Sequence, residues 1–459
     1  MDRFYPRFMI LFSAICLLLI CLCGCSPSVW VHYPNRLSRA KLFLTEGRDS
    51  LAEKELNNRL KAAQDRLLYS LEMGMVHYLK QDFDQSIQEW LVAEEIVKKF
   101  DFRPVVSIRE VSEQIGTLAV NDYLMTYQGM TYERVLLHLY LTLAFMMKSD
   151  SEGARIELKN AEQVQKKGFE KWQERRSTQL KDTPDAEKLE KELIDVYHSR
   201  YGMDESYTSF SLNPLVYYLS GWLYEEAGYP DEALIDYRRL WGLGIKTNTI
   251  AQSIEQLNKK MASSWSAGGK SSEREYGHLL ILHHQGLVPP LEEIRIPVQI
   301  KGSLVIMALP AYPEYPPSVM GLRIRTGEWS VETQELVDVY SLAKESLRER
   351  IPGIVAREVA RMIVKANAAR EMSKQKGSLA SMVATIYNIV SEKADLRSWL
   401  TLPLSIQVGQ MRLPPGRNII NMDLINGAGN LQTEIEIKPG KYHILDVRSI
   451  GSRIVSHFY

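Results

Sequence analysis

Two short stretches contain residue types that bind phosphate or metal ions. Gly269-Lys270-Ser271 has the sequence that ends a phosphate-binding loop, but such a loop needs a further glycine where this chain has Ser264, and no apolar strand precedes it. His283-His284 is the only pair of adjacent histidines. Neighbouring side chains of a strand point to opposite faces, which makes them a poor metal-binding pair. The sequence therefore predicts neither a nucleotide site nor a metal site, and no cofactor.

Sequence motifs of common enzyme classes are missing as well. The chain has no Gly-x-Ser-x-Gly and no His-Glu-x-x-His motif. All four cysteines, Cys16, Cys21, Cys23 and Cys25, lie in the first 25 residues, so the rest of the chain has no cysteine nucleophile, no thiolate metal site and no disulfide. These features predict a protein that is not an enzyme.

A polar, aromatic-rich stretch between two helical patterns is the candidate partner-binding site. It contains Asn121, Asp122, Tyr127, Tyr132, Glu133 and Arg134. Loops at one edge of a helical array are common binding surfaces for peptides and proteins. The alternative is that Asn121 caps the next helix and that the tyrosines pack beneath it.

The N-terminal residues have the pattern of an export signal. Arg3 and Arg7 precede an apolar run from Phe8 to Leu22, and a small residue, Gly24, follows. Leu22-Cys23-Gly24-Cys25 resembles the lipobox of bacterial lipoproteins, which implies a signal peptide over 1–24, acylation of Cys25 and a lipidated tether over 25–36. Because Ser26 replaces the aspartate that signals inner-membrane retention, the resemblance implies a lipid anchor on the periplasmic face of the outer membrane. An uncleaved N-terminal helix is the alternative.

Composition and charge limit the choice of partner. The chain has 459 residues, of which 45% are hydrophobic and 24% charged, as in an ordinary globular protein of two or three domains. Removal of residues 1–24 would leave 54 basic and 55 acidic side chains. A net charge near −1 offers no electrostatic attraction for nucleic acid, so the expected partners are an envelope protein or peptide and the membrane reached through the lipid anchor.

Residues 37–262 have helical periodicity throughout and contain a spacing that recurs. A small residue on one helix is followed by a second small residue on the next helix and, four positions later, by a large one; the examples include Gly74, Ser86 and Trp90, and Gly221, Ala233 and Tyr237. Such small residues let antiparallel helices approach closely. The pattern resembles the tetratricopeptide repeat, a helical hairpin of about 34 residues. An irregular helical bundle is the alternative.

The pattern changes after a linker over 263–275. Alternating strand patterns appear between 279 and 325, a helical pattern runs from Val331 to Ala394, and four or five strands with regular turns follow from Leu402 to Tyr459. We therefore expect an α+β domain over 276–459 that ends in a small antiparallel sheet or sandwich. The predicted fold class is multidomain, a tetratricopeptide-like helical array followed by this α+β domain.

Three segments together point to a family. They are the lipobox, the segment from Asn121 to His138, and Arg397-Ser398-Trp399-Leu400-Thr401-Leu402-Pro403. The chain resembles an uncharacterised family of proteobacterial lipoproteins with tetratricopeptide-like helical repeats. The expected function is that of a non-catalytic scaffold for protein–protein interaction in envelope assembly, secretion or cell-wall synthesis. A cell-wall hydrolase or a ligand-binding lipoprotein is the alternative.

Overall fold

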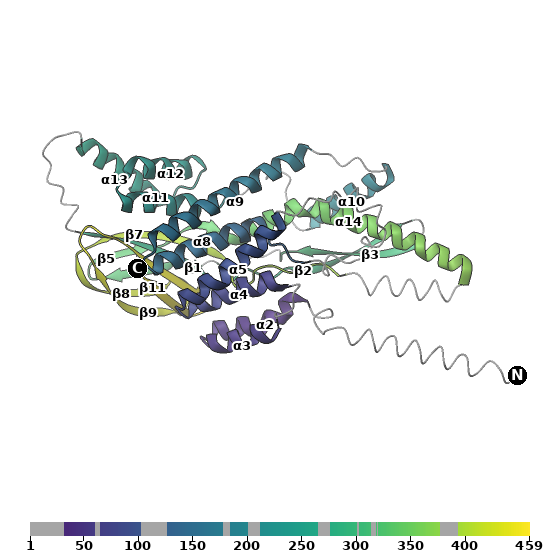
Figure 1. The fold of residues 1–459 in the computed structure, drawn as a ribbon, viewed down its shortest axis with the longest axis horizontal. Coiled ribbons are helices and arrows are strands. Elements are labelled where there is room, and N and C mark those ends of the chain that lie inside the picture. The colour runs from purple at the N-terminus through teal and green to yellow at the C-terminus, as the bar shows by residue number, and fades with distance from the viewer. Residues whose placement is uncertain are drawn as a thin grey trace.

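The computed structural model describes residues 32–59, 65–101, 126–177, 184–200, 212–264, 276–300, 303–313, 318, 320–376 and 393–459. Helices occupy the described residues up to Ser264, and strands with one long helix occupy the remainder (Figure 1). This arrangement agrees with the predicted helical part followed by an α+β part. Within the described ranges, no helix combines the length and the apolar character needed to cross a bilayer.

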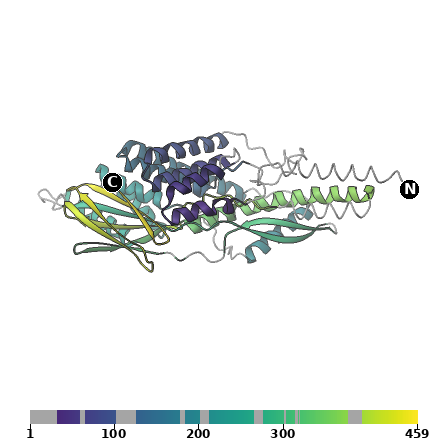
Figure 2. The same cartoon turned by 90° about the horizontal axis from the view of Figure 1, so that it is seen from below.

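The N-terminal helices form hairpins that lie side by side on one face of a β-sheet (Figures 1 and 2). They are α2 (Tyr33–Thr45) with α3 (Asp49–Arg59), α4 (Arg66–Leu79) with α5 (Phe83–Asp101), α8 (Thr131–Met147) with α9 (Ser151–Ser177), and α11 (Leu215–Ala227) with α12 (Pro230–Gly242). Of two further helices, α13 (Asn248–Ser264) packs against α12, whereas α10 (Pro184–Arg200) packs against the long helix α14 (Val339–Lys376).

These four hairpins use the same turn. A single residue with positive φ follows the first helix of each, namely Gly47, Gln81, Ser149 and Gly228. The next residue donates its backbone N–H to the carbonyl five positions earlier, at 2.8 to 2.9 Å. This is the Schellman ending of a helix, and it turns the chain within three residues so that the second helix packs back on the first.

The predicted close packing within hairpins is confirmed. A Cβ atom on Gly74 would lie 2.2 Å from the indole nitrogen of Trp90, and one on Gly221 would lie 2.8 Å from the ring of Tyr237. The large side chain therefore occupies the space that the glycine leaves open. Five positions after each positive-φ residue the chain has a fully buried small residue, and these are Ala52, Ser86, Ala154 and Ala233. The hairpin that contains Ala52 was not predicted.

The C-terminal part contains a β-sandwich. One sheet has the order β11 (Arg453–Phe458), β10 (Tyr442–Ile450), β1 (Gly277–Gln285), β7 (Ser405–Leu413), β6 (Gln334–Asp338). The other has the order β5 (Trp329–Glu332), β4 (Leu322–Thr326), β8 (Gly416–Leu424), β9 (Asn430–Ile437). Apolar side chains from both sheets share one cluster, which includes Leu279, Ile324 and Met422. The expected terminal sheet or sandwich is present only in part, because the strands after Leu402 pair with the earlier strands β1, β4 and β6. It is also not wholly antiparallel, because β1 and β10 run parallel.

A second unit extends away from the sandwich. The strands β2 (Glu292–Ile300) and β3 (Ser303–Ala311) form a separate hairpin, and the long helix α14 (Val339–Lys376) runs beside it (Figure 2). The helical pattern that was predicted from Val331 is wrong for its first residues, which belong to β5 and β6. Alternation over so short a stretch does not distinguish a strand from the first turns of a helix.

Strand β1 joins the helices to the sandwich because both of its faces are buried. Leu279 and Ile281 belong to the interior of the sandwich, whereas Leu280 and Leu282 belong to the core under the helices. Side chains alternate along a strand, so one strand contributes to two layers. The helices of the predicted domain 37–262 and the strands of the predicted domain 276–459 thus share one core, although a linker was expected between them.

Candidate binding site on the helical array

Of the four predicted partner-binding residues that the structure describes, three are interior. Cys25, Asn121 and Asp122 lie outside the described residues. Tyr127, Tyr132 and Glu133 are 3%, 6% and 0% exposed, so the expectation of an exposed loop is corrected for these three. Arg134 reaches the surface, where its guanidinium pairs with Asp101 at 2.9 Å and donates to the carbonyl of Gln128. The burial of the two tyrosines agrees with the alternative in which they are packed, whereas the cap by Asn121 that belonged to the same alternative lies outside the described residues.

Glu133 lies in the first turn of α8, where unpaired backbone N–H groups favour a carboxylate. Its Oε2 atom accepts hydrogen bonds from the Tyr127 hydroxyl at 2.5 Å and from the Met130 N–H at 2.8 Å. Its Oε1 atom accepts the N–H of Trp399 at 2.6 Å. Burial raises the pKa of Glu133, and these donors oppose the rise.

Glu72, in the middle of α4, makes an analogous set of contacts. It accepts the N–H groups of Leu400 at 2.8 Å and Thr401 at 3.1 Å, and the hydroxyls of Thr401 at 2.5 Å and Tyr33 at 3.0 Å. Burial raises the pKa of Glu72 to about 7, even though every one of these donors favours the charged form. The Glu72 carboxylate thus binds two consecutive backbone N–H groups and two hydroxyls in the interior of the protein.

Both carboxylates bind one segment, residues 394–404, which we call the strap. The strap has no regular secondary structure, and its apolar side chains are buried, among them Ala394, Leu396, Trp399, Leu400, Leu402 and Leu404. On the sheet side, Arg448 donates to the carbonyl of Thr401 at 2.8 Å. The strap therefore lies between helices and sheet with its peptide groups bound from both sides. It contains the segment Arg397–Pro403 that the family resemblance used.

The paired histidines of β1 point to opposite faces, as expected. His284 faces the helices, where its Nδ1 atom meets the Tyr140 hydroxyl at 3.1 Å and its Nε2 atom lies 2.7 Å from Asp446. The Tyr78 hydroxyl donates to the same carboxylate at 2.8 Å. All four groups are buried. The chain of hydrogen-bonded groups from Tyr140 through His284 to Asp446 resembles a proton relay. Because all of these groups lie in the core, the arrangement suits a structural role, in which hydrogen bonds attach α4 and α8 to the sheet.

His283 faces the sandwich and contacts Ser449 at 2.8 Å and Gln407 at 3.3 Å. Burial lowers the pKa of His283 to about 3, so the ring is neutral at physiological pH. A neutral imidazole can accept one hydrogen bond and donate another, which suits two polar neighbours. The pair was predicted to be structural rather than metal-binding, and these contacts are of that kind.

Two cavities lie among the described residues, and both are small. One, of about 70 Å³, is lined by Trp222, Gln252, Gln256, His278, Gln410 and Arg412. The other, of about 20 Å³, lies beside Tyr132, Gln165 and Glu345. One water needs roughly 10–15 Å³ of such space, so these cavities suit a few water molecules rather than a sugar or a peptide side chain.

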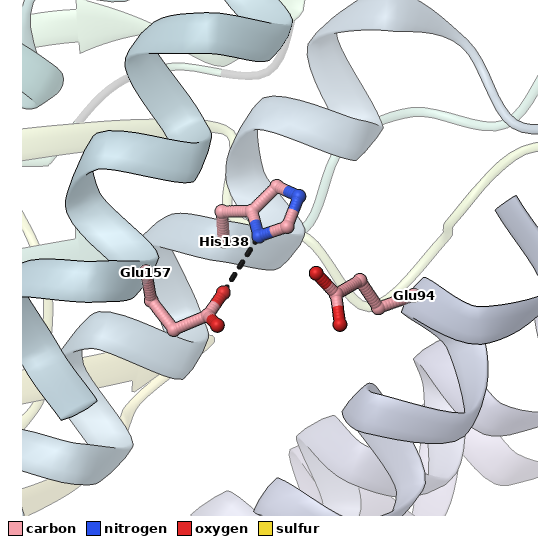
Figure 3. A group of neighbouring side chains, drawn as sticks. All are labelled: Glu94, His138 and Glu157. Atoms are coloured by element: carbon pink, nitrogen blue, oxygen red, sulfur yellow. Dashed lines mark hydrogen bonds and ion pairs between the residues drawn. The ribbon is translucent and has the colours of Figure 1, made fainter. Parts of the chain in front are cut away.

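One cluster has the composition of a metal site. Glu94 of α5, His138 of α8 and Glu157 of α9 point toward one another (Figure 3). The Nδ1 atom of His138 lies 2.7 Å from Glu157, and all three residues are buried. The cluster was missed because its members come from three helices and lie far apart in sequence, with no short motif that joins them.

The chain was also compared with known proteins. Among protein families, curated proteins and solved structures, the comparisons find no match.

Proposed function

We propose that this protein is an outer-membrane-anchored periplasmic lipoprotein that acts as a non-catalytic scaffold for another envelope protein. The N-terminal lipobox supports the anchor, and the helical array supports the scaffold. The observation on which the proposal chiefly depends is a concentration of exposed apolar side chains on the last hairpin. They are Tyr224, Tyr229, Ile235, Trp241 and Leu243, each between 40% and 65% exposed.

We further propose that the array is tetratricopeptide-like. The turn residues Gly47 and Gln81 are 34 positions apart, and Gln81 and Ser149 are 68 apart, which is twice the length of that repeat. Residues 102–125, which lie between these last two turns, are outside the described residues. Ser149 and Gly228 are 79 positions apart, so the register changes before the last hairpin.

The surface of the last hairpin suits a protein partner. Large exposed apolar side chains that are gathered on one hairpin suit an interaction site, and aromatic side chains are enriched at protein interfaces. The inner side of α11 faces the sheet, where the Tyr218 hydroxyl accepts a hydrogen bond from Gln410 of β7 at 2.8 Å, so a partner would meet the outer surface of α11 and α12.

Site-specific photo-crosslinking in cells tests the scaffold. A photoreactive side chain placed at Ile235, which is 65% exposed, should form an adduct with one envelope protein. The same group at Ile156 of α9 or Ile419 of β8, which are 53% and 54% exposed, provides matched controls and should form none. Equal adducts at all three positions, or none at Ile235, would contradict this surface.

The anchor has its own test. Cys25→Ser removes the thiol that would be acylated, so the protein should move from the outer-membrane fraction to the soluble periplasmic fraction. A chain that remains in the membrane fraction after this change is held by something other than lipid on Cys25. Incorporation of a labelled fatty acid into the unaltered chain, and its loss in the variant, checks the chemistry directly.

The alternative of a cell-wall hydrolase has weaker support. Such an enzyme needs carboxylates that face a substrate, whereas the closely placed Glu72 and Glu133 both accept backbone N–H groups of the strap. Release of soluble fragments from isolated sacculi by the purified protein would favour the hydrolase.

A further inference from the structure

Three potential metal ligands meet between two helical hairpins. One ring nitrogen of His138 and one oxygen each from Glu94 and Glu157 all lie within 4.8 Å of one another. Figure 3 shows Glu157 and Glu94 approaching the imidazole from two different helices. All three residues are less than 9% exposed, so solvent gives these carboxylates little screening.

Two buried carboxylates at this distance need a compensating positive charge. An ionised carboxylate loses hydration on burial, and a second one nearby adds repulsion. Glu94 pairs with Lys98 at 2.6 Å, and Glu157 accepts a bond from the Asn160 amide at 3.3 Å. The Lys98 side chain is 59% exposed, so its ammonium can move into solvent at little cost if another cation binds Glu94.

We propose that Glu94, His138 and Glu157 bind a divalent transition-metal ion of the zinc class. An imidazole nitrogen with two carboxylate oxygens is a ligand set that Zn²⁺ accepts. Mg²⁺ and Ca²⁺ prefer oxygen ligands only. Bond lengths of about 2.0–2.2 Å place the ligand atoms of a tetrahedral zinc ion about 3.4 Å apart. Side-chain rotations that separate His138 from Glu157 and bring Glu94 nearer would reach that spacing.

The ion would connect two hairpins. Glu94 belongs to the α4–α5 hairpin, whereas His138 and Glu157 belong to the α8–α9 hairpin, and α5 packs against α8. The chain has no cysteine after Cys25 and so cannot form a disulfide between these helices. A metal bound by side chains of separate elements stabilises their packing in a comparable way. The Asn160 amide would hold the Glu157 carboxylate in position without itself binding the ion.

Metal analysis and zinc titration of the full-length chain test the site. The protein, first stripped with a chelator, should bind one equivalent of Zn²⁺ and unfold at a higher temperature with the metal than without it. His138→Gln or Glu94→Gln should remove that equivalent and the thermal shift. Asn160→Ala should weaken binding about tenfold. His77→Gln alters another buried helical histidine, 8% exposed, and should leave both unchanged.

Four results would overturn the proposal, and the first three concern zinc uptake. They are a stripped protein that takes up no zinc, an equivalent that persists in both ligand variants, and an equivalent that is lost equally in His77→Gln. If His138→Gln fails to fold by circular dichroism, the Glu94→Gln and Asn160→Ala variants decide the result. A protonated His138 in the metal-free protein, seen by nuclear magnetic resonance and unchanged by added zinc, would show that a proton rather than a metal compensates the two carboxylates.

Discussion

Gly74 should be a position where alanine destabilises a helix. Alanine is normally the better helix former by about 1 kcal/mol. A Cβ atom at this position would, however, lie 2.2 Å from Nε1 of Trp90 and 2.6 Å from Cε2 of the same ring. The indole cannot move aside easily, because it is fully buried and in contact with the rings of Tyr78, Tyr140 and Trp399.

The magnitude follows from three contributions. Overpacking of a rigid core costs about 1–3 kcal/mol. Displacement of the indole also endangers its hydrogen bond to the carbonyl of Leu71, 3.2 Å long, whose loss costs about 1 kcal/mol. The gain in helix propensity offsets about 1 kcal/mol. Gly74→Ala should therefore lower the free energy of unfolding by about 1–3 kcal/mol.

Gly353→Ala is the matched control. Gly353 lies inside α14, and a Cβ atom there would meet only the end of the Arg357 side chain, at 3.6 Å. This change should raise the free energy of unfolding by about 0.5–1 kcal/mol. Urea unfolding followed by circular dichroism should thus move the midpoint in opposite directions for the two variants. A Gly74→Ala protein at least as stable as the original chain would refute the packing account of the hairpins.

Three further outcomes are expected. The pKa of Glu72 is raised to about 7, so the folded state binds a proton more tightly than the unfolded state does. Between pH 4.5 and 7 the free energy of unfolding should therefore fall as the pH rises, by at most about 1.4 kcal/mol per pH unit. Urea unfolding of Glu72→Gln should show a free energy of unfolding without this fall. The pKa of His283 is lowered to about 3, so the stability that the neutral ring contributes is present above pH 6.5 and is lost as the pH falls. In urea unfolding, His283→Gln should therefore lose less stability than the original chain between pH 6.5 and 4.5. Arg453 donates hydrogen bonds to both carboxylate oxygens of Asp49 at 2.6–2.7 Å. Arg453→Met should therefore lower the free energy of unfolding by about 1–3 kcal/mol and speed hydrogen exchange in α2 and α3. Arg417→Met removes an exposed ion pair and should change neither the free energy of unfolding nor the exchange.

Local patterns in the sequence predict much of the fold. The helical first half, the change to strands after the linker and the packing of Trp90 on Gly74 all follow from spacings of a few residues. The α2–α3 hairpin was missed because its small residues, Ala40 and Ala52, are alanines, which are common in any helix. The strands at 329–338 were missed because they are too short for their periodicity to be distinct.

The candidate binding site was only partly predictable because its contacts are distant in sequence. Glu133 looks like a polar loop residue, yet it accepts the N–H of Trp399, 266 positions away. Glu72 lies in a helix and bonds to residues 328 and 329 positions away. The sequence alone does not distinguish a buried glutamate from an exposed one, because burial depends on whether hydrogen-bond partners from distant segments reach it. The Glu94, His138 and Glu157 cluster was overlooked for the same reason.

The parallel pairing of β1 with β10 affects how the chain can reach its final state. Strand β1 lies near the middle of the sequence, but its neighbour ends at Ile450, and Tyr78 bonds to Asp446 across 368 positions. Until the ribosome has added these last residues, β1 has an open edge and the interior helices lack their polar partners. Open strand edges promote aggregation, so the nascent chain would need protection until synthesis is complete. A premature stop codon before β10 should therefore be as damaging as a deletion in the interior.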